Sequence, residues 1–393
     1  MNVLVISHTY ISPVNRTKWL ELAKHHPETH LTVLIPNRWK TSFFDIEGSV
    51  SDKDNTKNCH FVSLPAYITG NEQLYFYAPL KLAKLLIAVK PDIIHVEQGL
   101  HAVSYFQAIF FNAMLRIKAH CSFFTWINWQ PRYSFKTRLL TRILGFFNLA
   151  GSSGAITGNH DAKNILAAQR PGMPILVLPQ LGVNTQLFKP ARRAGHITDR
   201  KYILYAGRIA EEKGLITLIK AFAKLAPQHP AWDLLIVGSG PFEKQLIDYA
   251  LSKKLLSRVD FLAPVTHEKI ATILSTIDIL VLPSLDTPDW REQFGHVLIE
   301  AMACRVCVVG SDAGEIPRVI ADAGMTFKQG NDQSLYETLH MLITQDALRN
   351  NFAQKGLDRV LHLYTHRIIA EKTHGFWQSL ISKKHENANV SKN

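Results

Sequence analysis

The sequence predicts an α/β protein of two doubly wound, Rossmann-like domains that face a central cleft. Three observations support this class. The chain has 393 residues, which is longer than one ordinary domain. Its apolar fraction of 47% is enough for two packed cores. Short strand-like runs alternate with amphipathic helical stretches, a pattern typical of parallel sheets with helices on both faces.

The strand-like runs fall into two sets, six in the first half of the chain and five in the second. The helical stretch after the first run of the second set has Leu215, Leu218 and Phe222 at helical spacing, so this face should pack on a core. The runs are NVLVIS, HLTVLI, DIIHV, CSFFT, GAITG and PILVL, then YILYA, DLLIV, VDFLA, DILVLP and VCVVGS.

A change of composition predicts the domain boundaries. The segment Phe188–Arg200 is polar and poor in apolar residues, so we expect it to connect a domain at 1–190 to a domain at 191–364. The last strong helical stretch covers 365–384. The remainder, 385–393, is predicted to be a disordered tail.

Cysteine usage and the N-terminus predict a cytoplasmic protein. Four cysteines are too few for a disulfide framework in a chain of this length. Cys304 and Cys307 form a CxxC without a second ligand pair, so we expect two buried thiols and not a zinc or redox site. The N-terminus begins directly with a strand, so we expect no signal peptide. We also find no run of 18 apolar residues that could span a membrane.

The net charge of +12 is uneven along the chain. Residues 1–190 hold 19 basic and 10 acidic residues, whereas residues 191–393 hold 25 and 22. No acidic residue occurs between Glu97 and Asp161. This asymmetry predicts an anionic partner for the first half: a phospholipid surface, a phosphorylated acceptor or nucleic acid.

Within this acid-free span, residues 131–147 predict a basic amphipathic helix. Lys136, Arg138 and Arg142 lie among phenylalanine, leucine and isoleucine, a pattern that favours the surface of an anionic membrane. The alternative is a domain helix with its apolar face on the sheet and a solvated basic face. The acid-free span favours peripheral contact at the inner face of the cytoplasmic membrane. No nucleic-acid motif accompanies the charge, so we expect no nucleic-acid partner.

Residues just after the strands are where a doubly wound protein binds ligands. The loop after the first strand lacks GxGxxG, which argues against a nicotinamide or flavin oxidoreductase. In the stretch AGRIAEEKGL, Arg208 and Lys213 precede a helix. Cations are disfavoured at a helix N-terminus unless an anion lies between them. The alternative is two solvated charges, offset by Glu211 and Glu212.

The stretch EQFGHVLIEAMAC places two carboxylates eight residues apart. Glu292 is expected in a loop and Glu300 inside a helix that starts near Phe294 or Gly295. Even in a continuous helix this spacing would span about 12 Å. That is too far for a glycosidase-type pair or a shared metal, so we expect no metal. The spacing suits two hydroxyl-bearing groups on either side of a diphosphate.

Taken together, these motifs resemble the family-4 retaining glycosyltransferases of the GT-B fold, the glycosyl transferases group 1. The resemblance rests on AGRIAEEKGL, VGSGP, EQFGHVLIEAMAC and GSDAGEIPRVI, which occur in the family's order and spacing, and on the linker-like LPQLGVNTQLFKP. It covers essentially the full length. The helical stretch 365–384 resembles the segment of that family that crosses back to the first domain.

The resemblance implies roles for named residues. Arg208 and Lys213 would bind the donor diphosphate, Glu300 the nucleotide ribose, and Glu292 hydroxyls of the transferred sugar. The nucleotide sugar would be a substrate, so no cofactor is expected, and the α configuration would be retained without a protein nucleophile. Further donor contacts would come from Gly207, Gly238 and Gly240 and from the backbone of Phe294, Gly295, His296 and Val297.

The acceptor side departs from the family's pattern. Many members carry a histidine after a middle strand of the first domain, where this chain has CSFFTWINWQPRYS. Asn128 could supply a hydrogen bond there. His95 ends another strand, where the alternative is an ordinary packed histidine. Both are acceptor-side candidates.

The sequence therefore predicts a metal-independent, retaining, hexosyltransferase-type glycosyltransferase. It would move a sugar from a nucleotide-sugar donor to a glycan or lipid-linked acceptor in cell-surface polysaccharide synthesis. One alternative is a GT-B nucleotide-sugar epimerase, which would need further acid and base residues at the donor. The other is a non-catalytic nucleotide-sugar-binding protein.

Overall fold

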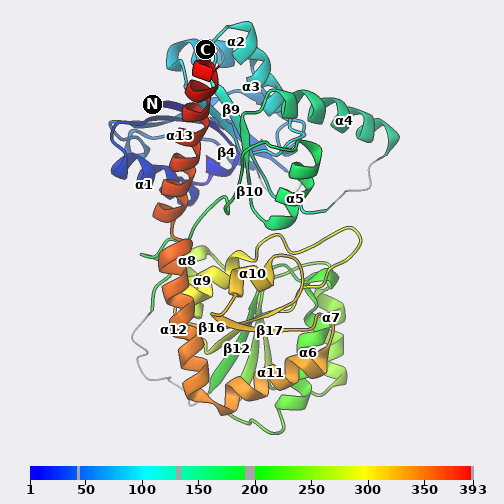
Figure 1. The fold of residues 1–393 in the computed structure, drawn as a ribbon. Helices are drawn as coiled ribbons and strands as arrows, with labels where there is room; N and C mark the ends of the chain where they lie inside the picture. Colours follow the sequence, from blue (N-terminus) through cyan, green and yellow to red (C-terminus); the bar gives the residue numbers. More distant parts are fainter. Residues whose placement is uncertain (42–44, 130–133, 191–199, 391–393) are drawn as a thin grey trace. The chain divides into compact units, whose positions relative to one another are not determined.

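The protein is described by a computed structural model that covers residues 1–41, 45–129, 134–190 and 200–390. It divides into two compact units (Figure 1). Unit 1 comprises Met1–Gly182 and His366–Asn393, and unit 2 comprises Val183–Thr365. Each unit is organised around one parallel sheet.

The main sheet of unit 1 has seven strands in the order β11-β10-β9-β8-β1-β2-β5, all paired in parallel. The chain winds outward from β1 in one direction and from β8 in the other, so the switch point lies between β1 and β8. The strands are β1 (Asn2–Ile6), β2 (His30–Pro36), β5 (Cys59–Leu64), β8 (Ile93–Val96), β9 (His120–Thr125), β10 (Gly154–Thr157) and β11 (Ile175–Val177), with two short antiparallel pairs, β3 (Arg38–Lys40) with β4 (Asp45–Glu47) and β6 (Ala66–Tyr67) with β7 (Phe76–Tyr77).

The helices of unit 1 include the last helix of the chain. Trp377 of α13 stacks on Trp19 of α1, with ring centroids 5.6 Å apart, and both side chains are fully buried. This contact fixes the C-terminal segment to the first unit through apolar burial. The helices are α1 (Thr17–His25), α2 (Pro79–Val89), α3 (Val103–Met114), α4 (Phe135–Ala150), α5 (His160–Gln169) and α13 (His366–Val390).

The sheet of unit 2 has six strands in the order β14-β13-β12-β15-β16-β17, again all parallel. Its switch point lies between β12 and β15. The strands are β12 (Lys201–Ala206), β13 (Trp232–Val237), β14 (Val259–Leu262), β15 (Ile279–Leu282), β16 (Cys307–Ser311) and β17 (Gly324–Phe327).

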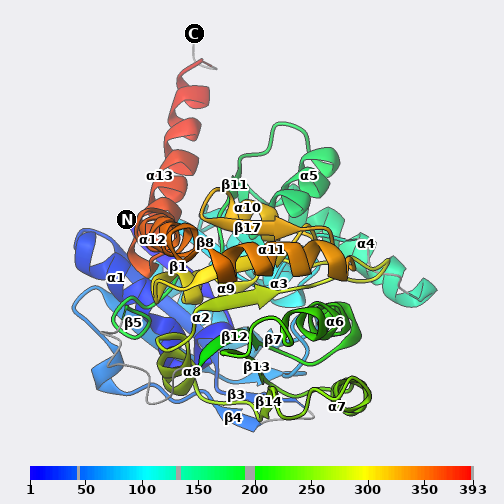
Figure 2. The same ribbon diagram turned by 90° about the horizontal axis from the view of Figure 1, so that it is seen from below.

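Helices cover this second sheet, and α6 packs beside α11 (Figure 2). The predicted apolar face of α6 is confirmed, because Leu215, Leu218 and Phe222 are all buried. The helices are α6 (Leu215–Leu225), α7 (Glu243–Ser252), α8 (His267–Leu274), α9 (His296–Ala303), α10 (Ile316–Ile320), α11 (Asp332–Thr344) and α12 (Asp346–Leu363), with the 3-10 turn η4 (Glu211–Lys213) before α6.

The predicted class, two doubly wound α/β domains, is confirmed. Strands β5 and β17 were not anticipated from the sequence. β5 lies at a sheet edge and mixes polar with apolar residues, and β17 is a short edge strand that begins with Gly324. The prediction of buried thiols at Cys304 and Cys307 is also confirmed. In the described part of the chain, no helix is both long enough and apolar enough to cross a bilayer.

The unit boundaries differ from the expected ones. Val183 already belongs to unit 2, because its backbone N–H donates to the carbonyl of Tyr364 at 2.7 Å and it forms a parallel bridge with Thr365. Most of the expected connector, 191–199, lies outside the described residues. Helix α13 continues to Val390, into the tail that we expected to be disordered, since no glycine or proline follows Gly375 to break the helix. Residues 391–393 lie outside the description.

Candidate functional site

Two adjoining cavities lie at the switch point of the unit 2 sheet. Each has a volume of about 310 Å³. Ala206, Gly207 and Arg208, directly after β12, line both of them, as does Val297 in the first turn of α9. In open parallel sheets the carboxyl ends of the strands at the switch point form the ligand site. The cavities therefore occupy the place where the fold predicts binding.

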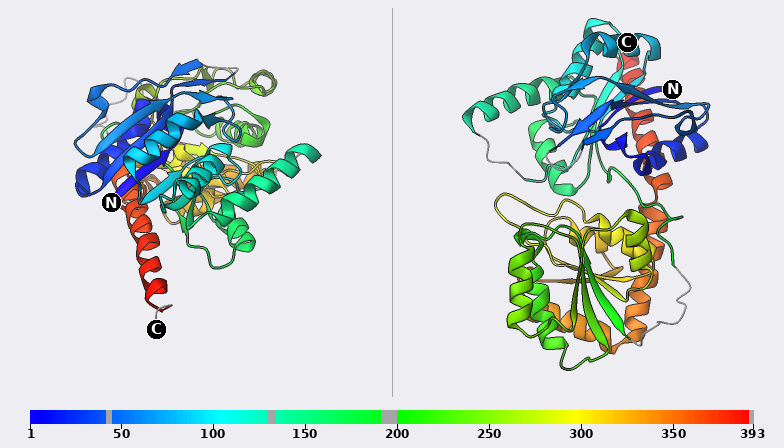
Figure 3. Two further views of the ribbon diagram at one scale, coloured as in Figure 1. Left: turned by 90° about the horizontal axis from the view of Figure 1, so that it is seen from above. Right: turned by 180° about the vertical axis from the view of Figure 1, so that it is seen from behind.

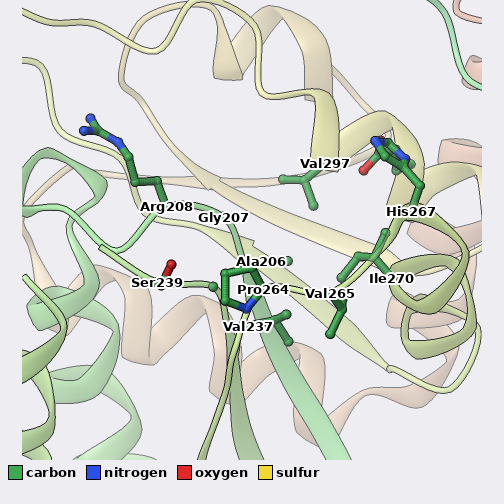
Figure 4. Close-up of a pocket in the computed structure, with 12 residues that line it drawn as sticks. Ala206, Gly207, Arg208, Val237, Ser239, Pro264, Val265, His267, Ile270 and Val297 are labelled. Carbon is green, nitrogen blue, oxygen red and sulfur yellow. The ribbon is translucent and has the colours of Figure 1, made fainter. Parts of the chain in front are cut away.

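The first cavity has mostly apolar walls (Figure 4). Arg208 and His267 stand on opposite sides of the labelled group in this view, and Val297 lies between them. A small set of polar groups on an apolar wall is typical of a site that orients one small molecule. Besides the four shared residues, the cavity is lined by Val237, Gly238, Ser239, Pro264, Val265, His267, Ile270 and Glu300.

Glu300 is the carboxylate of this first cavity. It lies on α9, and burial raises its pKa to about 7. The only nitrogen partner within ion-pair reach among the described residues is the exposed imidazole of His267, whose Nδ1 is 3.9 Å from Oε1. Because a carboxylate in this setting lacks strong partners, it is ready to accept hydrogen bonds from a ligand's hydroxyls.

The second cavity contains an ion pair between two of the predicted site residues. Lys213 Nζ donates to Glu292 Oε2 at 2.7 Å, and Ser284 Oγ donates to the same oxygen at 2.8 Å. The Lys213 ammonium also lies 4.4 Å from the ring centroid of Trp290, a cation–π contact. The structure thus brings Lys213 and Glu292 together at one wall, although 79 residues separate them in the sequence.

Arg208 lines both cavities and pairs with Glu212 of η4. Its backbone carbonyl accepts a hydrogen bond from the hydroxyl of Tyr205 at 2.7 Å, which fixes the loop after β12. The Arg208 side chain remains 57% exposed, so an incoming anion can reach it. The sequence left open that glutamates offset the two cations. Glu212 does so for Arg208, whereas Lys213 is paired with Glu292 instead.

The start of α9 forms part of the second cavity. Gly295 precedes the helix with φ of +83°, a conformation that glycine adopts without strain, and Gly295, His296 and Val297 line the cavity. Burial lowers the pKa of His296 to about 4, so its imidazole is neutral at pH 7. The N-terminal end of a helix attracts anions. Phe294 is buried instead, with its ring 5.6 Å from that of Tyr364.

Two of the predicted glycines allow the loops after β12 and β13 to meet. Gly207 and Gly238 both line the first cavity, and a Cβ on Gly238 would lie 1.9 Å from the carbonyl oxygen of Gly207. Gly240 lines neither of the cavities formed by described residues. It packs against the backbone of Ile209, where a Cβ would lie 2.2 Å from the carbonyl oxygen.

Gly314 is a positioning residue that the sequence motif contained but did not single out. It has φ of +51°, and a Cβ there would lie 2.1 Å from the carbonyl oxygen of Glu292. The next amide, of Glu315, donates to that same oxygen at 3.1 Å. The loop after β16 therefore fixes the backbone of Glu292. In the sequence, the glycine within GSDAGEIPRVI was the signal that could have indicated this close approach.

Both acceptor-side candidates belong to unit 1, and each is buried. His95 is fully buried within β8, where Nδ1 lies 2.8 Å from Ser122 Oγ and the ring packs edge-on against Trp377 at 5.5 Å. This is the packed-histidine alternative. Asn128 follows β9 and is 3% exposed.

The switch point of unit 1 holds a polar group that the sequence did not reveal. His8 follows β1, and its Nδ1 lies 2.9 Å from Oε1 of Gln98, which follows β8. The His8 ring stacks on Trp39 at 4.3 Å, and its Nε2 lies 3.4 Å from Oε1 of Glu72. These residues occupy the position in unit 1 that the cavities occupy in unit 2. The signal available was their place directly after strands.

One group of side chains in the described residues has metal-ligand spacing. His26, Glu28 and His374 offer ligand atoms within 4.8 Å of one another. All three belong to unit 1, and none of them lines the unit 2 cavities. The chemistry available at the cavities is instead that of two cations, a helix N-terminus and two carboxylates.

The ionisation of Glu300 predicts a pH-dependent affinity for nucleotides. A pKa raised to about 7 means that the side chain is largely protonated at pH 6 and ionised at pH 8. An ionised carboxylate accepts two hydroxyl hydrogen bonds. If the ionised form binds, affinity rises about tenfold from pH 6 to pH 8, following the ionised fraction.

Isothermal titration calorimetry with a nucleoside diphosphate at pH 6, 7 and 8 checks this prediction. Glu300→Gln is the matched variant, because it keeps the shape but cannot ionise. The nucleotide's own ionisation affects both proteins equally, so the difference between the two slopes reports Glu300. Equal slopes would show that Glu300 does not titrate at the ligand.

The part of the chain that contains these cavities is similar to known glycosyltransferases. Residues 189–359 match the family described as glycosyl transferases group 1. A phosphatidyl-myo-inositol mannosyltransferase of Mycolicibacterium smegmatis is 31% identical over 179 residues, 45% of this chain and 44% of that protein. The gpi3 subunit of the phosphatidylinositol N-acetylglucosaminyltransferase of Schizosaccharomyces pombe is 27% identical over 181 residues, 46% and 39% of the two chains. The chain spans about half the length of such relatives, or less.

Solved structures show the same fold over nearly the whole chain. A glycosyltransferase of Rickettsia africae has a TM-score of 0.71 at 15% identity and covers 96% of this chain and 98% of its own. Anabaena HepE, solved in complex with UDP, has a TM-score of 0.71 at 17% identity, with 96% and 100% covered. The two units thus have the fold of GT-B glycosyltransferases, and the residues that match the glycosyl transferases group 1 family, 189–359, contain both cavities.

Proposed function

We propose that this protein is a metal-independent, retaining glycosyltransferase. It transfers a sugar from a nucleotide diphosphate sugar to a glycan or lipid-linked acceptor in the synthesis of a cell-surface polysaccharide. One observation carries the proposal. Glu300 lines one cavity, the Lys213–Glu292 pair lines the adjoining one, and Arg208 lines both.

The donor would lie across the two cavities. Its nucleoside occupies the first, where apolar walls face the base and Glu300 accepts hydrogen bonds from the ribose hydroxyls. Its diphosphate lies at Arg208, Lys213 and the N-terminus of α9, where positive charge gathers. Its sugar lies in the second cavity, and Glu292 binds the sugar hydroxyls.

The residues act mainly on the leaving group. As the bond between the anomeric carbon and the phosphate oxygen breaks, the nucleoside diphosphate gains negative charge. Arg208 and Lys213 neutralise that charge in a site that is already arranged for it. The acceptor hydroxyl forms the new bond on the same face of the sugar, and its proton passes to the departing phosphate. No side chain is covalently modified.

Binding of a phosphate group would also release Lys213 from its present partner. Lys213 Nζ is now held by Glu292 Oε2 at 2.7 Å. A phosphate near the ammonium competes for it, which leaves Glu292 able to accept hydrogen bonds from the sugar. The ion pair thus holds both side chains in position before the donor binds. It also means that neither charge is buried without a partner.

The acceptor would bind to unit 1, at the carboxyl ends of β1 and β8. His8, Gln98 and Trp39 offer there the aromatic ring and the hydrogen-bonding groups that a sugar requires. Both relatives named above are enzymes of phosphatidylinositol lipids by name, which supports a lipid-linked acceptor. A location at the inner face of the cytoplasmic membrane would give access to such an acceptor.

Thermal stabilisation by nucleotides tests the proposal directly. UDP, GDP and ADP are added in turn, with EDTA present, to the wild type and to Lys213→Ala. At 100 times its dissociation constant a ligand adds roughly 2.7 kcal/mol to the free energy of unfolding. For a unit of this size the melting temperature then rises by roughly 5–10 °C. We expect one nucleotide to stabilise the wild type and to stabilise the variant less.

The same experiment separates the alternatives. Hydrolysis and transfer assays with sugars carrying the stabilising base follow the melting curves. Binding without any turnover would favour a non-catalytic binding protein, and interconversion of the donor without an acceptor would favour an epimerase. If none of the three nucleotides stabilises folded protein, the donor-site assignment is wrong.

A further inference from the structure

Helix α4 packs on unit 1 through a narrow and largely polar stripe. Thr141, Leu144 and Asn148 are buried at helical spacing, and Gly145 lies among them. Asn148 Nδ2 donates to the carbonyls of Leu100 at 2.7 Å and of residue 102 at 3.1 Å. A Cβ on Gly145 would lie 3.1 Å from the ring of His101, so α4 approaches unit 1 closely at this position. The contact of α4 with unit 1 therefore buries little of the apolar area of this helix.

Apart from Leu144, most of the large apolar residues of α4 lie away from this stripe and are exposed. Phe135 is 82% exposed and Phe146 is 70% exposed, and Leu139 and Ile143 between them are also exposed. The spacing of four, four and three residues places these side chains on one face of the helix. Figure 3 shows α4 extending away from the sheet of unit 1. The surface continues through Leu140 and Phe147 of α4 and Phe110 and Met114 of α3.

We call this set of eight residues the α4 surface. It contradicts the alternative that the apolar face of this helix packs on the sheet. A contiguous exposed apolar area of this kind on a protein surface marks an interaction site. Contacts such as those of Phe106 with Phe110 and with Phe147, at 6.0–6.4 Å between ring centroids, show that α3 and α4 form one continuous surface.

Cations border the α4 surface, and acids are excluded from the whole surrounding segment. Arg138 and Arg142 are exposed on α4, and Arg116 and Lys118 are exposed directly after α3. No acidic residue occurs in the chain between Glu97 and Asp161. A bulky apolar stripe flanked by arginines is the arrangement of helices that lie in the interface of an anionic bilayer. The apolar face enters the acyl region while the guanidinium groups bind lipid phosphates.

We propose that the α4 surface docks unit 1 onto an anionic phospholipid membrane. The occupant is a lipid surface because its phosphates match the cations and its acyl region matches the phenylalanines. A second copy of this chain is a poorer match, because a twofold contact through α4 would bring Arg138 and Arg142 of both copies together without acids. The proposal does not depend on which sugar is transferred, or on whether the donor assignment is correct.

Vesicle co-sedimentation of the full chain tests the proposal. The vesicles are phosphatidylcholine alone and phosphatidylcholine mixed with phosphatidylglycerol. We expect the wild type to bind the mixed vesicles at low ionic strength and to bind phosphatidylcholine weakly. The variant Phe135→Asn/Phe146→Asn should lose binding at least tenfold, since each buried phenylalanine contributes strongly to partitioning. Arg138→Gln/Arg142→Gln should lose roughly thirtyfold on the anionic vesicles, at about 1 kcal/mol for each arginine.

Matched controls change similar residues elsewhere. Leu251→Asn removes an apolar side chain that is 58% exposed on α7 of unit 2, and Lys244→Gln/Lys253→Gln removes two exposed cations at the same helix. Both should bind vesicles like the wild type. Nucleotide stabilisation is measured on every variant and should be unchanged, which separates failure of docking from failure of the donor site.

Three outcomes would overturn the proposal. One is a wild type that does not bind anionic vesicles. Another is a phenylalanine variant that binds as tightly as the wild type while the controls behave as expected. The third is a change from dimer to monomer in the phenylalanine variant with vesicle binding intact, since that would show the α4 surface to be a self-association surface.

Discussion

Replacing Lys213 with alanine is expected to lower kcat/KM for sugar transfer about a hundredfold or more. Removal of one preorganised group that stabilises developing negative charge costs on the order of 3 kcal/mol of transition-state stabilisation. Lys213 is the less exposed of the two cations, at 15%, and it lines the second cavity together with the first turn of α9. Its charge is therefore screened less by solvent than that of Arg208.

The loss should appear mainly in kcat, because the leaving group gains its charge in the transition state. Steady-state kinetics with the nucleotide sugar that carries the stabilising base provide the measurement. Lys213→Arg keeps the charge and should retain more activity than Lys213→Ala. Lys220→Ala, an exposed lysine on α6 of the same unit, is the control and should be unaffected. An alanine variant with wild-type kcat would remove Lys213 from the mechanism.

A second large effect is expected on the stability of unit 1. Lys18 Nζ donates to Glu97 Oε1 at 3.0 Å, and both side chains are essentially inaccessible to water. Tyr10 and Gln180 donate to the other carboxylate oxygen at 2.5 Å and 3.1 Å. Burial alone would raise the pKa of Glu97, but Lys18 and its other partners, His95 and Tyr10, lower it to about 2.

Lys18→Met should therefore destabilise unit 1 by roughly 3–5 kcal/mol, because it leaves a buried carboxylate without its cation. The melting temperature should fall on the order of 10 °C. Since the folded pKa of Glu97 lies below its ordinary value of 4.5, the wild type keeps this contribution above pH 4.5 and loses it as the pH falls toward 2. Thermal melts at pH 7 and pH 3 provide the measurement.

Two further variants make the comparison specific. Lys18→Met/Glu97→Gln removes the charge of both partners and should recover part of the loss. Arg38→Met breaks an exposed pair with Asp45 in the same unit and should change the free energy of unfolding by less than about 1 kcal/mol. If Lys18→Met melts like the wild type at pH 7, the buried pair does not stabilise unit 1.

The residues that line the two cavities of unit 2 could be predicted because their signals are local. Arg208 and Lys213 precede one helix, and Glu292 and Glu300 flank the start of another. A short segment fixes the order of strand, loop and helix, and the rule for parallel sheets then places each loop at the carboxyl edge. Residues chosen in this way line the two cavities, with the exception of Phe294 and Gly240.

The partners of those residues could not be predicted, because they come from distant segments. Lys213 and Glu292 are 79 residues apart, and Gly314 holds Glu292 from the loop after another strand. One alternative from the sequence was that Glu211 and Glu212 offset the two cations. Lys213 pairs with Glu292 instead, because β15 lies beside β12 in the sheet and the loop after β15 therefore meets the start of α6.

The sequence by itself determined the alternation of strands and helices, the loops that line the two cavities, and the excess of positive charge between Glu97 and Asp161. Each of these depends on residue type and on spacing of a few residues. Only the tertiary structure decided that Glu97 is a buried partner of Lys18, and that α4 packs through Thr141, Gly145 and Asn148 while its phenylalanines face outward. Periodicity shows that a helix has two faces, but which face is buried depends on the shape of the surface it meets.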